Sequence, residues 1–469
     1  MSKTEIALTS LKNALDPKAW SENPDELAPH VQDWRGSHTG HTPILFKPSS
    51  TEEVTRIVQT CNDAGIAILP QSGNTGLVGG STPQGEVLIS LKRMNTIRAI
   101  DTANESITVD AGVILETVQD KAASVNKLFP LSLGAQGSAM IGGLISTNAG
   151  GVHVLRYGMM RELVLGLEAV LPNGTLLSDL TGLRKNNTGY DLKQLLIGAE
   201  GTLGIVTGAT LKLFPRPASM AVAIAAVPSP QGAVDLLEFM KTETGGAVAA
   251  FELMPKSALD LVFDHIPGTR NPLQSDPSWS VLIEVSSGQA DLANSILEAA
   301  LAKAFEADLI SDGAIAQSKT QAHEFWMLRE SIPEGEKAHG RAAKHDVSVA
   351  VSKMPAFMEE ATAMAEAFDS DVRVVAFGHV GDGNVHFNVG AKEKGADQTF
   401  LSKVKPVTRA IYDLVDKYGG SISAEHGIGV LKQDEFANRQ ASDIAIMRAI
   451  KAAIDPNNIM NPRVLLPKV

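Results

Sequence analysis

The first half of the chain alternates short apolar runs with short helical patterns and many glycines. A helix is predicted after Ser50, because Glu53 three residues later completes a capping box that satisfies the exposed amides of the first turn. Strands are predicted at 66–69, 87–90, 107–109 and 205–214, where β-branched residues cluster. The pattern is that of an α+β domain rich in turns.

A second alternation begins after the Pro215 to Pro217 break. It opens with an apolar run at 221–227 and a helix after Ser229, with Pro230 at its first position, and continues to about Phe368. We expect an antiparallel sheet with helices on one face, followed by a helical tail. The predicted boundaries are therefore 1–216, 217–400 and 401–469.

Composition narrows the class of protein. The 469 residues, 44% hydrophobic and 20% charged, suffice for two or three domains. A net charge of -12 without a long Lys/Arg block argues against nucleic acid as a partner. The single cysteine, Cys61, excludes an intrachain disulfide and fits a reducing compartment. The opening residues resemble no targeting peptide and no run nears the roughly 18 apolar residues of a membrane span, so we expect a cytoplasmic protein.

Three glycine-dense segments lie in the first domain, at 70–81, 134–151 and 187–205. Glycine allows positive φ and close approach, so successive N–H groups can surround a phosphate. Each segment alone is equally typical of ordinary turns. The G-x-G-x-x-G fingerprint of NAD-binding βαβ units is absent from the sequence, which argues against NAD on a Rossmann fold.

In this order and spacing the three segments resemble the FAD-binding domain of the vanillyl-alcohol oxidase and p-cresol methylhydroxylase superfamily. The resemblance implies an α+β fold with a two-subdomain flavin-binding domain, an antiparallel-sheet substrate (cap) domain and a C-terminal helical segment that packs back near the flavin. The implied FAD-binding residues are Pro70, Gly73, Asn74, Thr75, Gly76, Gly79, Ser81, Gly134, Ser138, Gly142, Gly143, Thr147, Asn148, Gly150, Glu200, Gly201, Ile205 and Asn461. Asn74 stands where some members carry a flavin-linking histidine, and His153 is the only imidazole nearby, so we expect non-covalent FAD.

A hairpin carrying two histidines is predicted at 374–389, where β-branched runs flank an Asp-Gly pair. With Asp382 and Gly383 as the turn, His379 faces His386 and Asn388 lies on the same face. Opposed Cβ atoms are about 4.5–5.5 Å apart, close enough for both imidazoles to bind one ion. A solvated polar face is the alternative.

A carboxylate for such a site is available in the tail, where Glu425 and His426 lie between a strand-like run and glycines. Two imidazoles and a carboxylate are a common open ligand set for zinc, and manganese and cobalt also suit it. Upstream, Arg329 and Lys344 are natural holders of carboxylates.

Together these motifs resemble the branch of the superfamily that contains D-2-hydroxyglutarate dehydrogenase, D-lactate dehydrogenase and the glycolate oxidase flavin subunit. The resemblance covers about Asp33 to Pro467. It implies His379, His386 and Glu425 as metal ligands, His426 as the base, and Arg329, Lys344 and Asn388 as substrate holders. Two departures are Pro333, where the best-known members place a threonine, and Arg463, where the family has glycine.

The implied reaction is oxidation of a D-2-hydroxy acid to the 2-oxo acid. The substrate's C1 carboxylate and 2-hydroxyl would chelate the metal, and His426 would take the hydroxyl proton while hydride passes to flavin N5. D-2-hydroxyglutarate is the first choice of substrate, and D-malate and D-lactate stay open because Pro333 removes a hydroxyl. Electron-transferring flavoprotein or a quinone would accept the electrons, and relatives imply a homodimer.

Two other functions compete with this one. The chain would act as a D-lactate dehydrogenase or as the flavin subunit of a larger glycolate oxidase complex. Flavin-dependent alkyl transfer, found elsewhere in the superfamily, would require a lipid-sized apolar tunnel.

Overall fold

The computed structural model describes residues 1–34, 36 and 38–467, which form two compact units. The first unit contains Met1–Gly151, Tyr157–Pro215 and the residues from Glu425 onward, and the second contains Val152–Arg156 and Arg216–Ala424. The boundary between the two units falls directly after Pro215, at the break predicted from the sequence. The tail predicted as one segment, 401–469, is divided between both units.

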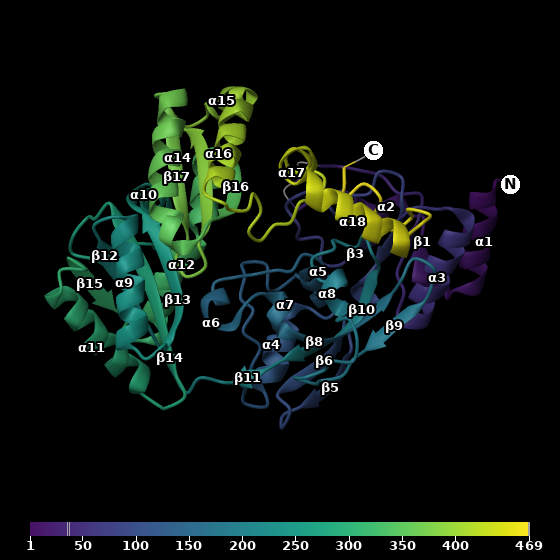
Figure 1. Cartoon of the computed structure of the whole chain (residues 1–469), viewed down its shortest axis with the longest axis horizontal. Coiled ribbons are helices and arrows are strands. Elements are labelled where there is room, and N and C mark those ends of the chain that lie inside the picture. Colours follow the sequence, from purple (N-terminus) through teal and green to yellow (C-terminus); the bar gives the residue numbers. More distant parts are fainter. Residues whose placement is uncertain (35, 37, 468–469) are drawn as a thin grey trace. The chain divides into compact units, whose positions relative to one another are not determined.

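Two main sheets build the first unit (Figure 1). The smaller is mixed, with parallel β2–β4 and β3–β4 pairs and the strand order β1 (Trp20–Ser21), β2 (Leu45–Phe46), β4 (Val87–Ser90) and β3 (Ile68–Gln71). The larger is antiparallel, in the order β5 (Ile97–Asp101), β6 (Ser106–Asp110), β10 (Ile205–Lys212), β8 (Val164–Val170) and β9 (Leu176–Asp179). A short ribbon pairs β7 (Lys127–Leu128) with β11 (Phe214–Pro215). The expected α+β architecture is confirmed, and two sheets form the body of this unit as its two subdomains.

Short helices connect these strands. They are α1 (Lys3–Ala14), α2 (Pro24–Val31), α3 (Thr51–Ala64), α4 (Leu115–Ala123), α5 (Ile141–Ser146), α7 (Met160–Leu163), α8 (Lys193–Leu196), α17 (Gln433–Arg439) and α18 (Ala441–Ile454), with single 3-10 turns at Pro17–Ala19 and Leu91–Arg93. Helix α6 (Val154–Tyr157) belongs to the second unit except for its last residue. The α3 start is as predicted, since the Ser50 hydroxyl accepts from the Glu53 amide. The second hydrogen bond of a capping box, from the Ser50 amide to Glu53, is replaced. The Glu53 carboxylate instead accepts hydrogen bonds from the backbone amide and the hydroxyl of Ser49.

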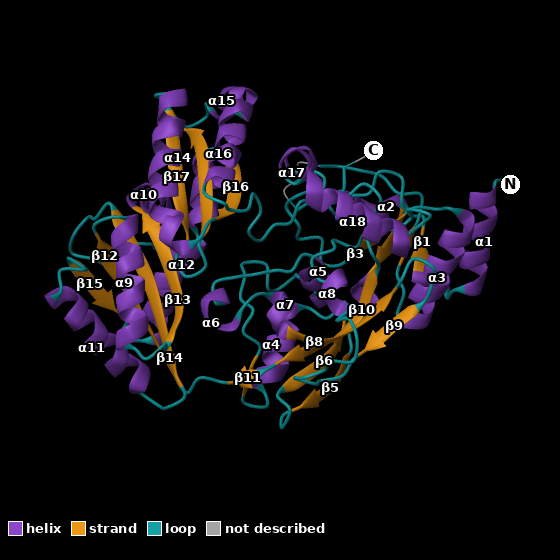
Figure 2. Ribbon diagram, in the orientation of Figure 1, coloured by secondary structure: helices purple, strands orange, loops and turns teal. Residues whose placement is uncertain are grey.

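The second unit is built on one antiparallel sheet of seven strands (Figure 2). Their order is β15 (Asp312–Ile315), β12 (Ser219–Val227), β14 (Trp279–Ser287), β13 (Val248–Pro255), β17 (Val372–His379), β18 (Asn384–Ala391) and β16 (Ala342–Ser348). The helices are α9 (Pro230–Glu243), α10 (Lys256–His265), α11 (Leu292–Glu306), α12 (Lys319–Glu330), α13 (Ile332–His339), α14 (Met354–Phe368), α15 (Asp397–Lys403) and α16 (Lys405–Lys417), with a 3-10 turn at Val351–Lys353.

Helices cover both faces of this sheet, so the prediction of helices on one face was wrong. One core joins the sheet to α9, α11, α14 and α16, and a second core joins the opposite face to α10, α12 and α13. The cause is visible in the strands. Runs such as Ala221–Val227 and Val281–Val285 are buried at every position, which is the pattern of a strand covered on both sides.

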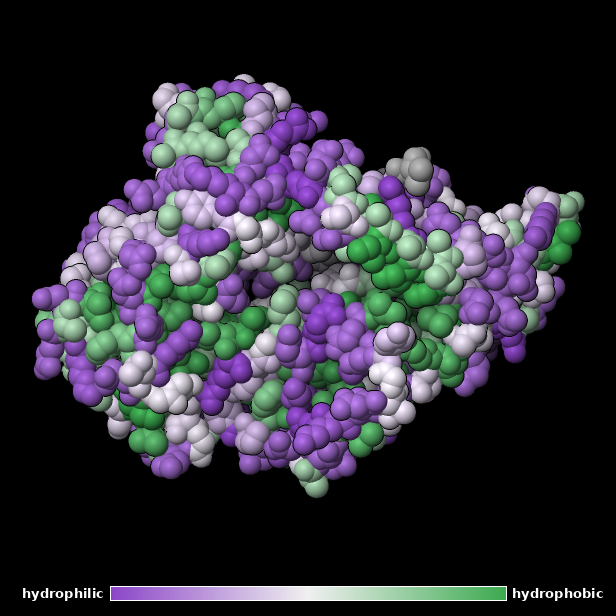
Figure 3. All heavy atoms as spheres, viewed as in Figure 1, coloured by the Kyte–Doolittle hydropathy of each residue, from purple (hydrophilic) through white to green (hydrophobic). Residues whose placement is uncertain are grey.

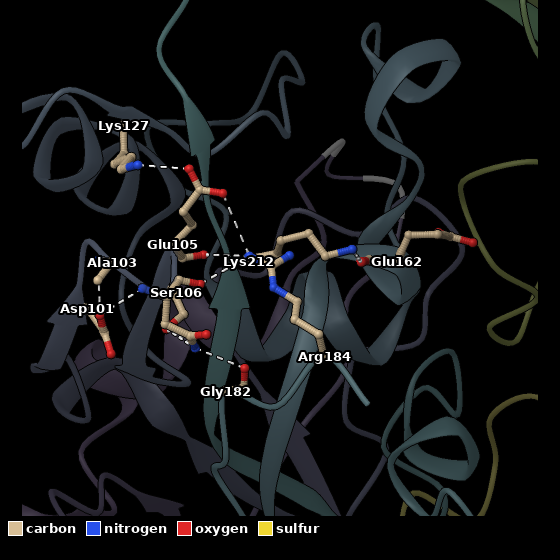
Figure 4. Close-up of polar contacts among 10 residues, drawn as sticks. Asp101, Ala103, Glu105, Ser106, Lys127, Glu162, Gly182, Arg184 and Lys212 are labelled. Carbon is tan, nitrogen blue, oxygen red and sulfur yellow. Dashed lines mark hydrogen bonds and ion pairs between the residues drawn. The ribbon is translucent and has the colours of Figure 1, made fainter. Parts of the chain in front are cut away.

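A polar network fixes the end of the five-stranded sheet of the first unit (Figure 4). Lys127 Nζ lies 2.8 Å from the Glu105 carboxylate, and the Glu105 carbonyl accepts from the Leu213 amide at 2.7 Å. Lys212 Nζ donates to the Glu162 carbonyl at 2.8 Å, and burial lowers the pKa of Lys212. Arg184 donates to the Asn104 carbonyl, which anchors the loop that leads to the third glycine segment.

The surface of the chain mixes polar and apolar residues. On the face seen in Figure 3, apolar side chains gather in separate patches among polar ones. Among the described residues, no helix combines the length and the apolar character that crossing a bilayer requires.

A buried ion pair ties the last helix to the first unit. Lys451 Nζ contacts the Asp455 carboxylate at 2.5 Å and donates to the Thr202 and Met460 carbonyls at 2.7 Å each. Asp455 also accepts from the amides of Ile459 and Met460. The pair thus positions two segments that carry predicted cofactor residues.

Lys451→Met should lower the free energy of unfolding by about 3–5 kcal/mol, because it leaves the Asp455 carboxylate buried without its cation. Chemical denaturation followed by tryptophan fluorescence measures the loss. Lys12→Met, which removes a surface partner of Glu22, is the matched control and should cost about 0–1 kcal/mol. Equal losses for the two variants would contradict the role given to Lys451.

Candidate functional site

The glycine segments meet around a cavity of about 360 Å³ within the first unit. Among the predicted cofactor residues, those that line it are Pro70, Gly73, Asn74, Thr75, Gly76, Ser81, Gly134, Gly142, Gly143, Thr147, Gly150, Glu200, Gly201, Ile205 and Asn461. Gly79, Ser138 and Asn148 do not line it. The structure therefore brings together segments that are more than a hundred residues apart.

Backbone amides of the first glycine segment suit an anionic group. Within the described part of the chain, no residue accepts a hydrogen bond from the N–H groups of Asn74, Thr75 or Gly76. Asn74 itself has φ 54°, and its side chain donates to the Gln32 carbonyl and accepts from the Ser81 hydroxyl. Such a run of donors is the arrangement that cradles phosphates.

Two glycines of the cavity cannot carry a side chain. A Cβ on Gly73 would lie 2.3 Å from the carbonyl oxygen of Ser138. A Cβ on Gly201, where φ is 73°, would lie 2.6 Å from Cγ of Pro70. Close packing of the first segment against each of the other two therefore shapes the wall.

Glu200 holds the loop that follows His426. Its carboxylate accepts from the amides of Ile428 and Gly429, at 2.8 Å each. Burial raises the pKa of Glu200, although these amides and the charge of Lys432 oppose the rise. Since His426 lines the same cavity, Glu200 helps to position the imidazole predicted as the base.

The C-terminal segment closes the cavity through Asn461. Its side-chain amide donates to the Glu200 carbonyl at 2.8 Å, and its backbone amide donates to the Ile68 carbonyl. Asn74, Asn148, Glu200 and Asn461 are four of the ten described non-glycine residues with positive φ. Backbone strain of this kind concentrates at functional sites.

Apolar side chains of the wall were missed from the sequence. The lining also includes Leu77, Val78, Leu133, Met140, Leu144 and Val206. Four of them, Leu77, Val78, Met140 and Leu144, lie inside the first two glycine-dense segments, where the glycines drew the assignment and the apolar residues did not. Together they make a mostly apolar cavity with few polar groups, as cofactor sites usually are.

The second unit carries the predicted histidine hairpin with a different register. His379 faces Asn384 and His386 faces Phe377, so the loop has four residues instead of the predicted two. His379 and His386 are therefore diagonal neighbours on one face, with ring centroids 5.6 Å apart. Asn388 lies on this face as predicted. The pairing was wrong, whereas the shared face is confirmed.

A buried carboxylate orients His379. Nδ1 of His379 lies 2.7 Å from Oε1 of Glu252, and Arg329 Nε donates to Oε2 at 2.9 Å. Burial would raise the pKa of Glu252, but the charges and hydrogen bonds of His379 and Arg329 outweigh it and lower that pKa. Its contribution to stability is thus present above the usual carboxyl range and is lost as pH falls through the lowered pKa. Glu252 thus orients the Nδ1 side of the His379 ring.

The three predicted substrate holders lie on elements of the second unit. Arg329 stands at the end of α12, with its guanidinium 4.7 Å from the Phe377 ring centroid. Lys344 and Asn388 are opposed residues of β16 and β18, and both contact the buried Glu336. Glu252 and Glu336 were not predicted from the sequence. A single charge inside the apolar β13 run was the available signal for Glu252.

Glu425 directly follows Ala424, the last residue of the second unit. The amide of Ala424, the preceding residue, donates to the Asp346 carbonyl at 3.3 Å, and Asp346 faces His386. Asp346 Oδ1 lies 3.8 Å from His386 Nδ1. His153, the other imidazole considered, belongs to the second unit and lies 3.1 Å from the Glu284 carboxylate.

Family models match most of the chain. The FAD binding domain matches residues 42–179, and the C-terminal domain of FAD linked oxidases matches residues 216–465. The first and second glycine-dense segments lie within the FAD binding domain match. The histidine hairpin lies within the match to the C-terminal domain.

Several relatives are similar over nearly the whole chain. A protein of Arabidopsis thaliana named mitochondrial D-2-hydroxyglutarate dehydrogenase is 38% identical over 97% of this chain and 80% of its own length. A D-2-hydroxyglutarate dehydrogenase of Xanthomonas citri is 37% identical over 98% of this chain and 96% of its own. A putative D-lactate dehydrogenase of Schizosaccharomyces pombe is 37% identical over 97% and 86%.

Solved structures share the fold at low identity. p-Cresol methylhydroxylase has a TM-score of 0.75 at 18% identity, with 98% of this chain and 96% of that one covered. Alkyldihydroxyacetonephosphate synthase has a TM-score of 0.74 at 18% identity, with 97% and 86% covered.

Gly73→Ala should sharply reduce FAD content, because the added Cβ meets the Ser138 carbonyl and displaces the first segment. The ratio of flavin to protein absorbance in the purified chain measures the effect. Gly288→Ala, where a Cβ has no neighbour within 4 Å, is the control and should keep its flavin. Full flavin content in the Gly73 variant would show that this approach is dispensable.

Proposed function

Because the chain belongs to the FAD-linked oxidase family of the vanillyl-alcohol oxidase and p-cresol methylhydroxylase superfamily and is an FAD-dependent hydroxy-acid dehydrogenase, we propose that it oxidises D-2-hydroxyglutarate to 2-oxoglutarate. The observation that carries the proposal is the pair of imidazoles on one face of the hairpin, 5.6 Å apart, beside Lys344 and Asn388. A metal end and a carboxylate-binding end on one sheet face suit a hydroxy acid with a second acidic group.

A divalent cation would be held by His379, His386 and Glu425, with zinc as the first choice and manganese or cobalt as alternatives. FAD, when bound without a covalent link, would accept the hydrogen and electron pair from C2, and the cation would act as a Lewis acid. The donor set fits such an ion, because imidazole and carboxylate are its usual ligands and Glu252 fixes the orientation of the His379 ring.

The side chains of the protein would bind the substrate and move one proton. His426 would accept the proton of the 2-hydroxyl as the C2 hydrogen leaves, which yields the 2-oxo group. Asn388, Lys344 and Arg329 would hold the carboxylates. Arg329 uses Nε for Glu252, and its Nη groups donate to no other described residue, so they suit a substrate oxygen.

The partners of the enzyme belong to the same proposal. Electron-transferring flavoprotein or a quinone would oxidise the reduced cofactor, and the chain would act as a homodimer. A cytoplasmic location rests on the single cysteine, which is buried and free. The relatives from Arabidopsis thaliana and Danio rerio are named mitochondrial.

Anaerobic titration of the FAD-loaded protein with D-2-hydroxyglutarate should bleach the flavin absorbance, and the L enantiomer should not. D-Malate and D-lactate complete the panel. Bleaching by D-lactate alone would replace the proposed substrate with that of a D-lactate dehydrogenase. No bleaching by any 2-hydroxy acid would remove the dehydrogenase proposal and leave alkyl transfer to be tested.

His426→Ala should lower turnover by about a hundred- to ten-thousandfold while flavin and metal content are kept, since general base help is lost. His379→Ala should instead lose the metal, as measured by elemental analysis, and keep its flavin. Turnover that survives removal of the metal with a chelator would rule out the cation's role. Unchanged turnover of the His426 variant at pH 7 would remove that residue from the mechanism.

A further inference from the structure

The face of the second sheet that carries the two histidines also carries polar and charged side chains of β16, β17 and β18. Register places His379 and His386 at one end, Lys344 opposite Asn388 in the next row, and Arg373 opposite Gly390 in the row beyond. Alternate residues of a strand are roughly 7 Å apart, so Asn388 lies one such step from His386. This spacing is on the scale of a small hydroxy acid.

A carboxylate of the protein itself lies beside the opposed pair Lys344 and Asn388. Glu336 reaches in from α13 and is only 1% exposed. Its Oε2 lies 2.9 Å from Lys344 Nζ and accepts from Asn388 Nδ2 at 3.0 Å. Two of the three side chains proposed to hold the substrate therefore already contact an internal anion.

The polar groups around Glu336 are incompletely bonded within the described chain. Oε1 of Glu336 and the Nε and Nη1 atoms of Arg373 are buried and find no partner among the described residues. Burial lowers the pKa of Arg373, and the Glu336 charge opposes that change. Buried groups in this state are usually completed by a ligand or by water. Gly390 leaves room for the guanidinium, since a Cβ there would lie 3.0 Å from Arg373 Nη2.

We propose, resting on the proposed function, that Glu336 is a specificity-determining residue that weakens selection for a second carboxylate on the substrate. The distal carboxylate of a diacid must share Lys344 and Asn388 with a buried like charge. Like charges that are brought together in a desolvated site repel, whereas the methyl group of D-lactate meets no such opposition. The enzyme would therefore accept short neutral-tailed 2-hydroxy acids alongside the diacid.

The test is Glu336→Gln, which removes the charge and keeps the volume and one acceptor. In the FAD- and metal-loaded enzyme, the ratio of kcat/KM for D-2-hydroxyglutarate to kcat/KM for D-lactate should rise by about tenfold or more. Glu334→Gln is the matched control, because Glu334 is an exposed residue of the same helix, and it should leave the ratio unchanged.

A binding readout separates specificity from chemistry. The dissociation constants of 2-oxoglutarate and pyruvate, measured by calorimetry, should shift in the same sense, with 2-oxoglutarate gaining relative to pyruvate in the Glu336 variant. If Glu336→Gln does not fold, Glu336→Leu serves the same comparison.

The outcomes are distinct. A wild-type enzyme that reduces its flavin with no D-2-hydroxy acid overturns the proposed function. An active wild type whose ratio is unchanged or lowered in the Glu336 variant overturns only the present inference. A raised ratio in both kinetics and binding supports it.

Discussion

The second unit depends on one buried carboxylate. Glu252 is completely buried in the central strand β13, and a charge in that position requires partners. The partners are His379 on the neighbouring strand and Arg329 from the helix packed above. One group therefore fixes the tautomer of an imidazole, the direction of a guanidinium and the join between α12 and the sheet. Loss of either partner would leave the carboxylate unpaired in the core.

Much of the first unit could be predicted from the sequence because its signals are local. The α3 start, the β4 strand and the three glycine segments follow from capping, β-branching and positive φ. Asn148 and Ser138 were predicted to bind the cofactor, and each also makes a contact within the protein. Asn148 accepts from the Arg161 amide, and the Ser138 carbonyl packs against Gly73. Such tertiary roles leave no trace in the spacing of glycines.

The hairpin shows where local rules stop. An Asp-Gly pair favours a two-residue turn, but Gly383 packs against the Val349 backbone and its amide donates to the His379 carbonyl. Those contacts set a four-residue loop and shift the register. Glu336 was equally unpredictable, because Ile332–His339 reads as a solvated helix and only the fold buries one of its acids.

The first unit is built from separate stretches of the chain. This arrangement determines the order in which the parts of the protein can fold. Ile68 in β3 donates to the Ile459 carbonyl and accepts from the Asn461 amide, so the edge of an early strand is completed by residues almost four hundred positions later. The second unit is nearly continuous, from Arg216 to Ala424. On the ribosome it can fold while the nucleotide-binding core still waits for its closing segment, so cofactor capture belongs to the last stage of biogenesis.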